Sequence, residues 1–289
     1  MTFSNSGHTV KRFDLEIQQL VNLVLEMGRE VEQQVKRAVA VFREGDPVAA
    51  QAVIAGDEAV NRWDMEIDRS CVRLLSRRQP MSTDLRLVMA LNKAVNDLER
   101  IGDEAKTIAE KTLAIHARCG HPPRSIPLAV DQLAAIASQR IQSALDILAR
   151  LDVNQAWEMV RTDEAEEVFQ DILRELSTYT IDGELAVATV IDVSLALKAL
   201  KRVADRARNL AEYVIFVVEG QDVRHGDDVT AQDPAILKRV ERSSHQKKSS
   251  ADGRLRIPLA SCGIQVNFCK NPRCPNYGVP AAQTTGRGS

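Results

Sequence analysis

A segment that occurs twice constrains the fold of this chain more than any other feature. Residues Leu98–Glu110 (LERIGDEAKTIAE) and Leu200–Glu212 (LKRVADRARNLAE) align at an offset of 102 positions, and six of the thirteen pairs are identical. A repeated unit of about 100 residues implies a duplicated fold. Because both copies keep arginine and aspartate at matched positions, the repeat bears on function as well as on fold.

Each half of the chain carries three long helical patterns, in which apolar residues recur at three- and four-residue steps. The six patterns cover about residues 13–44, 47–75, 82–118, 126–151, 154–177 and 185–219. Gly45 and Pro47 separate the first two, and Gly220 is the expected end of the last. Short connections between long amphipathic helices favour antiparallel neighbours. The sequence therefore predicts an all-α protein of two tandem antiparallel three-helix bundles, residues 13–118 and 125–220, related by a pseudo-twofold repeat.

Composition excludes several classes of protein. Aromatic residues make up only 4% of the chain, which favours closely packed helices over a β-sandwich. The net charge of −2 provides no overall attraction to nucleic acid. The sequence shows no apolar run long enough to span a membrane and no secretion signal at its start. We therefore expect a cytoplasmic protein that does not bind nucleic acid.

The best candidate for chemistry is an acidic face on the third predicted helix. Glu99 and Asp103 are four residues apart, so they share a face and repel each other unless a cation lies nearby. That cation is either a bound metal ion or a basic side chain such as Arg100. One helix supplies too few ligands for a complete metal site, so acids of other helices would have to contribute. The candidates are Asp57 in the second helix and Asp163 and Glu167 in the fifth.

Arg100 and Asp103 recur as Arg202 and Asp205 in the second copy. For the two arginines we favour salt bridges that tie helices together over phosphate contacts. The sequence shows no nucleophile beside a histidine in an informative pattern, and no GxxxxGK[ST] or GxGxxG loop. We therefore expect a binding or regulatory module and no enzyme.

These motifs resemble the phosphate-uptake regulator family called PhoU. The first repeat contains Gln79-Pro80, Asp84-Leu85-Arg86, Asp97–Asp103 and Ile108-Ala109-Glu110 in order over about 30 residues, and the second keeps a similar segment from Arg202 to Glu212. The resemblance spans roughly residues 13–220. It implies a non-enzymatic negative regulator of phosphate uptake. Such a regulator acts in the cytoplasm between the ABC phosphate importer with its ATPase and a sensor histidine kinase, often as a homodimer, and reaches the membrane only through these partners.

The resemblance also implies metal binding through an acid-x-x-x-Asp motif on the third helix of each repeat. In the first repeat the motif is Glu99 and Asp103, which would hold a divalent ion or an iron or zinc cluster. The matching positions in the second repeat are Lys201 and Asp205. Because lysine donates hydrogen bonds and does not ligate as a carboxylate does, a second cluster is in doubt.

Residues 221–289 differ in character from the helical part. They form a polar linker and a tail with Cys262, Cys269 and Cys274. The cysteine spacing allows part of a zinc site, and residues 267–280 faintly resemble the zinc-ribbon start of some transposases. We expect the segment to be a disordered extension that is foreign to the family.

Three functions follow in order of preference. The first is a helical signalling adaptor that restrains phosphate uptake and phosphate-starvation signalling. The second is a metal-binding bundle for metal sensing or storage, with Glu99 and Asp103 as ligands. The third, a DNA-binding regulator that uses the basic linker and the tail, is disfavoured by the near-neutral charge.

Overall fold

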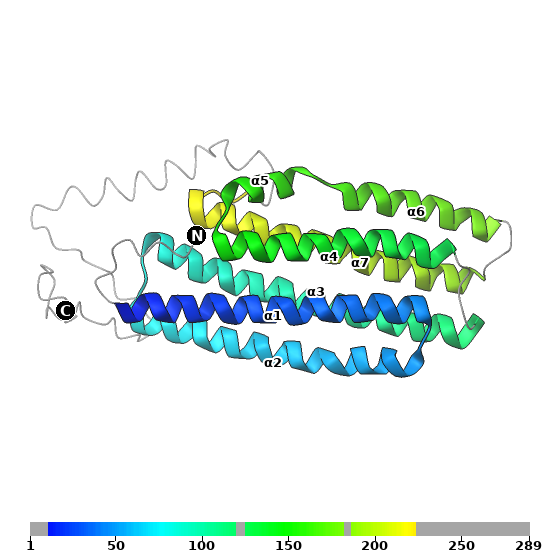
Figure 1. Ribbon diagram of the computed structural model, residues 1–289, viewed down its shortest axis with the longest axis horizontal. Helices are drawn as coiled ribbons and strands as arrows, with labels where there is room; N and C mark the ends of the chain where they lie inside the picture. The colour runs from blue at the N-terminus through cyan, green and yellow to red at the C-terminus, as the bar shows by residue number, and fades with distance from the viewer. Residues whose placement is uncertain (1–10, 120–124, 182–185, 224–289) are drawn as a thin grey trace, which may run out of the picture. The chain divides into compact units, whose positions relative to one another are not determined.

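Long helices account for almost all of the chain that can be described. The computed structural model describes residues 11–119, 125–181 and 186–223, and no strand occurs among them (Figure 1). The helices are α1 (Lys11–Glu44), α2 (Pro47–Arg78), α3 (Ser82–Cys119), α4 (Ser125–Arg150), α5 (Val153–Arg161), α6 (Glu164–Ile181) and α7 (Val187–Glu219). The all-α prediction is confirmed. Of these helices, none is long and apolar enough to cross a lipid bilayer.

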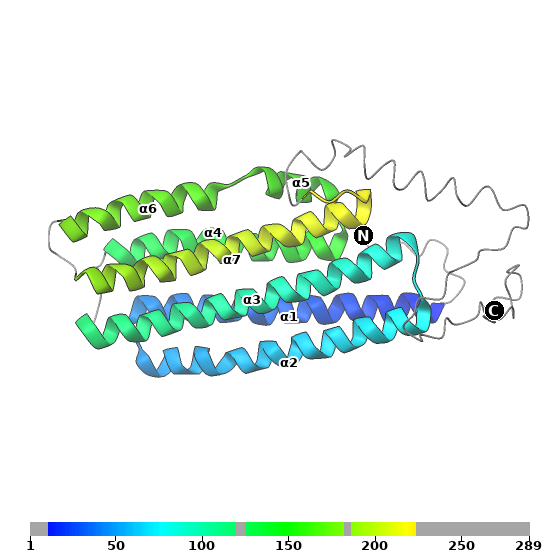
Figure 2. The ribbon, with the colours of Figure 1, turned by 180° about the vertical axis from the view of Figure 1, so that it is seen from behind.

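The helices form two three-rod bundles. One bundle contains α1, α2 and α3, and the other contains α4, α7 and a rod built from α5 followed by α6 (Figures 1 and 2). The most extensive contact between any two helices is that of α3 with α7, and α1 also touches α4. The third helices of the two repeats therefore lie side by side at the centre of the described residues.

A single apolar core runs through both bundles. In α3 and α7 the buried apolar residues recur along most of the length of each helix, because both helices are covered on several sides. Gly28 of α1 lies where this helix packs against Leu145 of α4. A Cβ atom at that position would lie 2.3 Å from Cδ2 of Leu145 in α4, so the present packing of this leucine depends on the absence of a side chain at position 28.

Local capping explains where the helices begin and end. Asp46 accepts hydrogen bonds from the amides of Val48 and Ala49, and Pro47 occupies the first turn of α2. Gly45 and Gly220 follow α1 and α7 with φ angles of 68° and 78°. Glycine adopts such angles without steric cost, and the predicted ends at these residues are confirmed.

The predicted single helix over residues 154–177 is wrong in one respect, because it is interrupted. Thr162 has extended backbone angles, φ −100° and ψ 133°, and separates α5 from α6. Thr162 and Asp163 are residue types that favour helix ends over helix interiors. The carbonyl of Thr162 accepts a hydrogen bond of 2.9 Å from the buried Arg140 of α4, so its hydrogen-bonding capacity is met at the break. The predicted tail with Cys262, Cys269 and Cys274 lies outside the described residues.

Candidate functional site: a polar groove between the third helices

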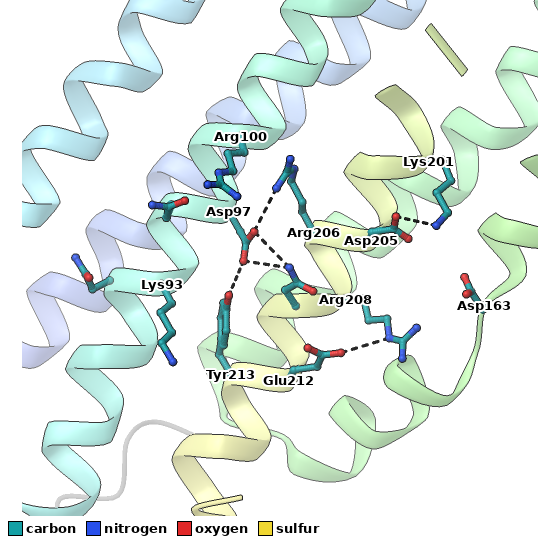
Figure 3. A pocket seen from close by; sticks show the side chains of 13 residues that line it. Lys93, Asp97, Arg100, Asp163, Lys201, Asp205, Arg206, Arg208, Glu212 and Tyr213 are labelled. Atoms are coloured by element: carbon teal, nitrogen blue, oxygen red, sulfur yellow. Dashed lines mark hydrogen bonds and ion pairs between the residues drawn. The ribbon is translucent and has the colours of Figure 1, made fainter. Parts of the chain in front are cut away.

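A groove of about 650 Å³ lies along the contact between α3 and α7 (Figure 3). Its wall consists of polar residues from both repeats, with Asp163 contributed by the connection between α5 and α6. The lining residues are Asn92, Lys93, Asn96, Asp97, Arg100, Asp163, Lys201, Asp205, Arg206, Arg208, Asn209, Glu212 and Tyr213. Five of them are basic, four are acidic and none is aliphatic, which is unusual for a pocket because most ligand pockets are lined mainly by apolar groups.

Asp97 of α3 is the polar anchor of the groove. The residue is only 6% exposed, and its carboxylate accepts a hydrogen bond of 2.6 Å from the hydroxyl of Tyr213 in α7. The side-chain amide of Asn209 donates to both carboxylate oxygens at 3.3 Å, and Arg206 lies 3.7 Å away (Figure 3). A buried carboxylate is stable only when it is paired and hydrogen-bonded, and here α7 supplies every one of these partners.

Glu104 forms a second polar link between the repeats, two turns further along α3. It is 5% exposed, and its carboxylate lies 3.4 Å from Arg206 and 3.5 Å from Arg202, both on α7. Arg206 therefore bridges Glu104 and Asp97. Arg202, one of the two recurring arginines, forms an ion pair between the third helices.

Arg100, the other recurring arginine, makes no hydrogen bond or ion pair within the described part of the chain. It is exposed on the side of α3 that lines the groove, one turn from Asp97 (Figure 3). Lys93, two turns from Arg100 on the same face, lies over the rings of Tyr213 and Phe216, at 5.9 and 5.4 Å from their centroids.

The acidic pair of the first repeat does not line the groove. Glu99 and Asp103 lie on the side of α3 that faces α2, near Asp57 and Asp64. Partial burial and then repulsion from Asp103, Asp64 and Asp57 hold the pKa of Glu99 above its ordinary value. Partial burial and then repulsion from Asp57 raise the pKa of Asp103 in the same way, although Lys106 opposes the shift. This face therefore carries negative charge that the neighbouring side chains do not fully balance.

The matching positions of the second repeat are neutralised by a side chain of the protein itself. The Lys201 ammonium lies 2.9 Å from the Asp205 carboxylate and 2.8 Å from that of Glu166 in α6. Burial opposes the charged form, but these two hydrogen-bonded carboxylates raise the pKa of Lys201. In each repeat the third-helix motif thus faces the second rod of its own bundle, and among the described residues only the second repeat has a cation in ion-pair contact with an acid of the motif.

The remaining candidate ligands are not gathered into one site. Asp57 is buried and its carboxylate lies 3.2 Å from the Lys106 ammonium, whereas Asp163 is at the groove and Glu167 is exposed on α6. Within residues 11–119, 125–181 and 186–223, no three His, Cys, Asp or Glu side chains are grouped so that they could hold one metal ion. Metal binding at Glu99 and Asp103 stays a prediction.

The sequence singled out Arg202 but did not indicate which other polar residues join α3 to α7. These residues include Asp97, Glu104, Asn209 and Tyr213, and each pairs with a residue of the other third helix. Such pairing between distant positions cannot be read from a single sequence. One signal was present: Asp97 and Glu104 are seven residues apart, in line with the apolar seam of the third helix. Acids on a buried stripe imply buried partners elsewhere.

The fold and the groove define a class of protein, a tandem repeat of three-helix bundles joined by charged third helices. The PhoU domain model matches residues 24–112 and 130–214, one match in each bundle. The chain belongs to the PhoU family.

Relatives of known name agree with this assignment. A protein of Pseudomonas aeruginosa named phosphate-specific transport system accessory protein PhoU homolog is 38% identical over 223 residues, which cover 77% of this chain and 91% of that protein. The Escherichia coli protein named phosphate-specific transport system accessory protein PhoU is 33% identical over 225 residues, which cover 77% of this chain and 92% of that protein.

Two solved structures share the fold. The crystal structure of PhoU from Pseudomonas aeruginosa superposes with a TM-score of 0.68 and 36% identity, covering 72% of this chain and all of that one. PhoU from Streptococcus pneumoniae superposes with a TM-score of 0.67, covering 73% of this chain and 99% of that one; at 23% identity this likeness concerns the fold alone.

Proposed function

We propose that this chain restrains phosphate uptake and phosphate-starvation signalling as an accessory of a phosphate transport system. The observation that carries the proposal is the paired PhoU match together with relatives that bear the accessory name and are covered over about nine tenths of their length. We propose further that the chain acts in the cytoplasm by binding the importer ATPase and a sensor histidine kinase, and not by catalysis.

The surface chemistry supports a role in transient binding. The exposed surface of α2 mixes charged side chains of both signs, such as Arg62 and Glu66, with exposed apolar ones, such as Val72, and such a mixed surface is usual for interfaces that form and dissociate. Charged residues at the rim of such an interface mainly control how fast partners associate and how strongly salt weakens the complex.

The function is tested in a strain from which the gene has been deleted. Loss of the chain is expected to raise phosphate uptake and the expression of phosphate-starvation genes in phosphate-rich medium, and a plasmid copy is expected to restore both. Uptake of labelled phosphate and a starvation-gene reporter are the two measurements. Normal values of both in the deletion strain would contradict the proposal.

The partners are tested by capture of the tagged full chain from phosphate-replete cells. The importer ATPase and the kinase are expected to co-purify at low salt and to be released as the salt concentration rises. Recovery of neither partner, from cells in which both are present, would contradict the adaptor role without contradicting the regulatory one.

A metal-binding role is a second candidate, favoured by two observations on the carboxylates between α2 and α3. The raised pKa values of Glu99 and Asp103 indicate a cluster of carboxylates that a cation would stabilise, and Oδ1 of the buried Asp57 makes no hydrogen bond. Glu99 and Asp103 would hold the ion, and the ion would supply positive charge between α2 and α3. Elemental analysis of the purified chain and of the Asp103→Asn variant tests this. A metal content that is zero, or that is equal in both proteins, would remove the candidate.

A further inference from the structure

The groove between α3 and α7 carries two cationic side chains on its α3 wall. Lys93 and Arg100 are two turns apart on the same side of α3, and neither forms an ion pair within residues 11–119, 125–181 and 186–223. A free ammonium and a free guanidinium on one wall of a groove attract an anion, and the guanidinium also presents a planar fork of donors.

The opposite wall contributes donors that lack acceptors. The Nε atoms of Arg206 and Arg208, both on α7, are buried and make no hydrogen bond. Arg208 lies 3.5 Å from the Glu212 carboxylate, yet its Nε–H does not point at that oxygen well enough to form a hydrogen bond. A buried donor without an acceptor costs free energy, and a ligand with several acceptor oxygens would recover part of it.

Three of the four acids of the groove already have partners within the described residues, so the groove suits a cation poorly. Asp97 is held by Tyr213, Asn209 and Arg206, and Asp205 is held by Lys201. The third of these, Glu212, lies 3.5 Å from Arg208, and Asp163 is the exception. No group of three potential metal ligands occurs in the part of the chain that the structure describes.

We propose that this groove binds a small phosphorylated anion, either inorganic phosphate or a phosphorylated metabolite, between Lys93 and Arg100 on α3 and the two arginines of α7. Tetrahedral phosphate oxygens match guanidinium donors bidentately, which makes arginine well suited to recognise them. The volume of about 650 Å³ exceeds what one phosphate needs and has room for a nucleotide. The absence of aliphatic side chains from the lining favours a polar ligand over an apolar one.

A ligand in this groove would also affect the contact between the two repeats. Arg206 reaches from the groove to Asp97 and Glu104, so a ligand that contacts this arginine acts on the polar links between the repeats. The inference goes beyond the regulatory function and does not depend on it, since binding is measured on purified protein and regulation is measured in cells.

The test is calorimetric titration of the purified full chain at constant ionic strength with inorganic phosphate, pyrophosphate and ATP in separate experiments. Four variants are compared with the unchanged protein. Arg100→Gln and Lys93→Gln each remove one free cation from the groove. Asp163→Asn removes a negative charge from it, and Arg62→Gln removes an exposed charge from α2, outside the groove. Far-UV circular dichroism and the melting temperature establish that each variant is folded.

Saturable binding is expected for at least one of the three anions. Its dissociation constant is expected to rise about tenfold in Arg100→Gln and in Lys93→Gln, to fall in Asp163→Asn and to stay unchanged in Arg62→Gln. Tighter binding of phosphate than of ATP would identify the free ion as the ligand, and the reverse order would identify a phosphorylated metabolite. Absence of saturable binding for all three anions, or an equal loss in Arg62→Gln, would overturn the proposal.

Discussion

Tyr213 donates a hydrogen bond of 2.6 Å to Asp97 across the contact between the two repeats. Both residues are buried, and they lie on the third helices of different bundles, 116 positions apart in the chain. A hydrogen bond to a buried charged group contributes more to stability than one between neutral groups, because the unpaired charge would be costly. The contact therefore helps to hold the duplicated halves in one register.

Tyr213→Phe is expected to lower the free energy of unfolding by about 1–3 kcal/mol, because it removes the hydroxyl that Asp97 needs. Urea unfolding monitored by circular dichroism measures the change. The double variant Tyr213→Phe/Asp97→Asn is expected to lose less than the sum of the two single losses. Additive losses would show that the hydrogen bond does not couple the helices.

The two acids on the α2 side of α3 make stability depend on pH. Because the pKa values of Glu99 and Asp103 are raised by folding, the folded state retains protons that the unfolded state has released. Their contribution to the free energy of unfolding therefore declines as the pH rises from the ordinary carboxyl range through the raised values.

Asp103→Asn removes one of these charges. The variant is expected to melt about 1 °C above the unchanged protein at neutral pH and low salt, and the difference is expected to vanish below the ordinary carboxyl range. Glu58→Gln, an exposed acid of α2, serves as the control. A lower melting temperature for Asp103→Asn at neutral pH would show that the attraction of Asp103 to Lys106 outweighs the repulsion.

Lys201 places a cation between Asp205 and Glu166 in the second repeat. Its replacement should leave the negative charges of these two acids unbalanced. Lys201→Glu places a third carboxylate beside Asp205 and Glu166 and is expected to lower the melting temperature by about 5 °C. The melting temperature of Lys201→Gln is expected to lie between those of Lys201→Glu and the unchanged protein. Addition of Mn²⁺ is expected to stabilise Lys201→Glu more than Lys201→Gln. An equal response of the two variants would show that the acids around position 201 do not meet at one ion.

Gly28→Ala tests the close approach of α1 and α4. The added methyl group would overlap the end of the Leu145 side chain, and the strain should outweigh the better helix propensity of alanine. We expect the free energy of unfolding to fall by about 1 kcal/mol. The double variant Gly28→Ala/Leu145→Ala is expected to lose less than the sum of its parts. A more stable Gly28→Ala would mean that Leu145 adjusts freely.

The rods and their ends could be predicted because their causes are local. Periodic apolar residues indicate a helix, and Asp46, Pro47 and Gly220 act on their own neighbours in the chain. The break at Thr162 was missed for the opposite reason. The apolar pattern continues across it, and the group that satisfies its carbonyl, Arg140, is 22 positions away on another helix.

The candidate site was predicted only in part. The repeated motif drew attention to Arg100 and Arg202, yet the structure gives them different surroundings. Arg202 pairs with Glu104, whereas Arg100 lines the groove and forms no ion pair with another described residue. The repeated motif could not predict the different surroundings of Arg100 and Arg202, because these depend on which residues of the other repeat lie opposite each arginine.

By itself the sequence determined that the chain is helical, that it consists of two related halves, and that acids and arginines recur on the third helix of each. Only the tertiary structure decided that these two helices pack against each other, that Asp97 meets Tyr213, and that Lys93 and Arg100 line the groove between them without an ion pair to any described residue. The physical reason is the separation along the chain of the residues that interact. Helix formation depends on residues three or four positions apart, whereas pairing of charges across a bundle depends on residues that are brought together only after about 100 positions of chain have folded.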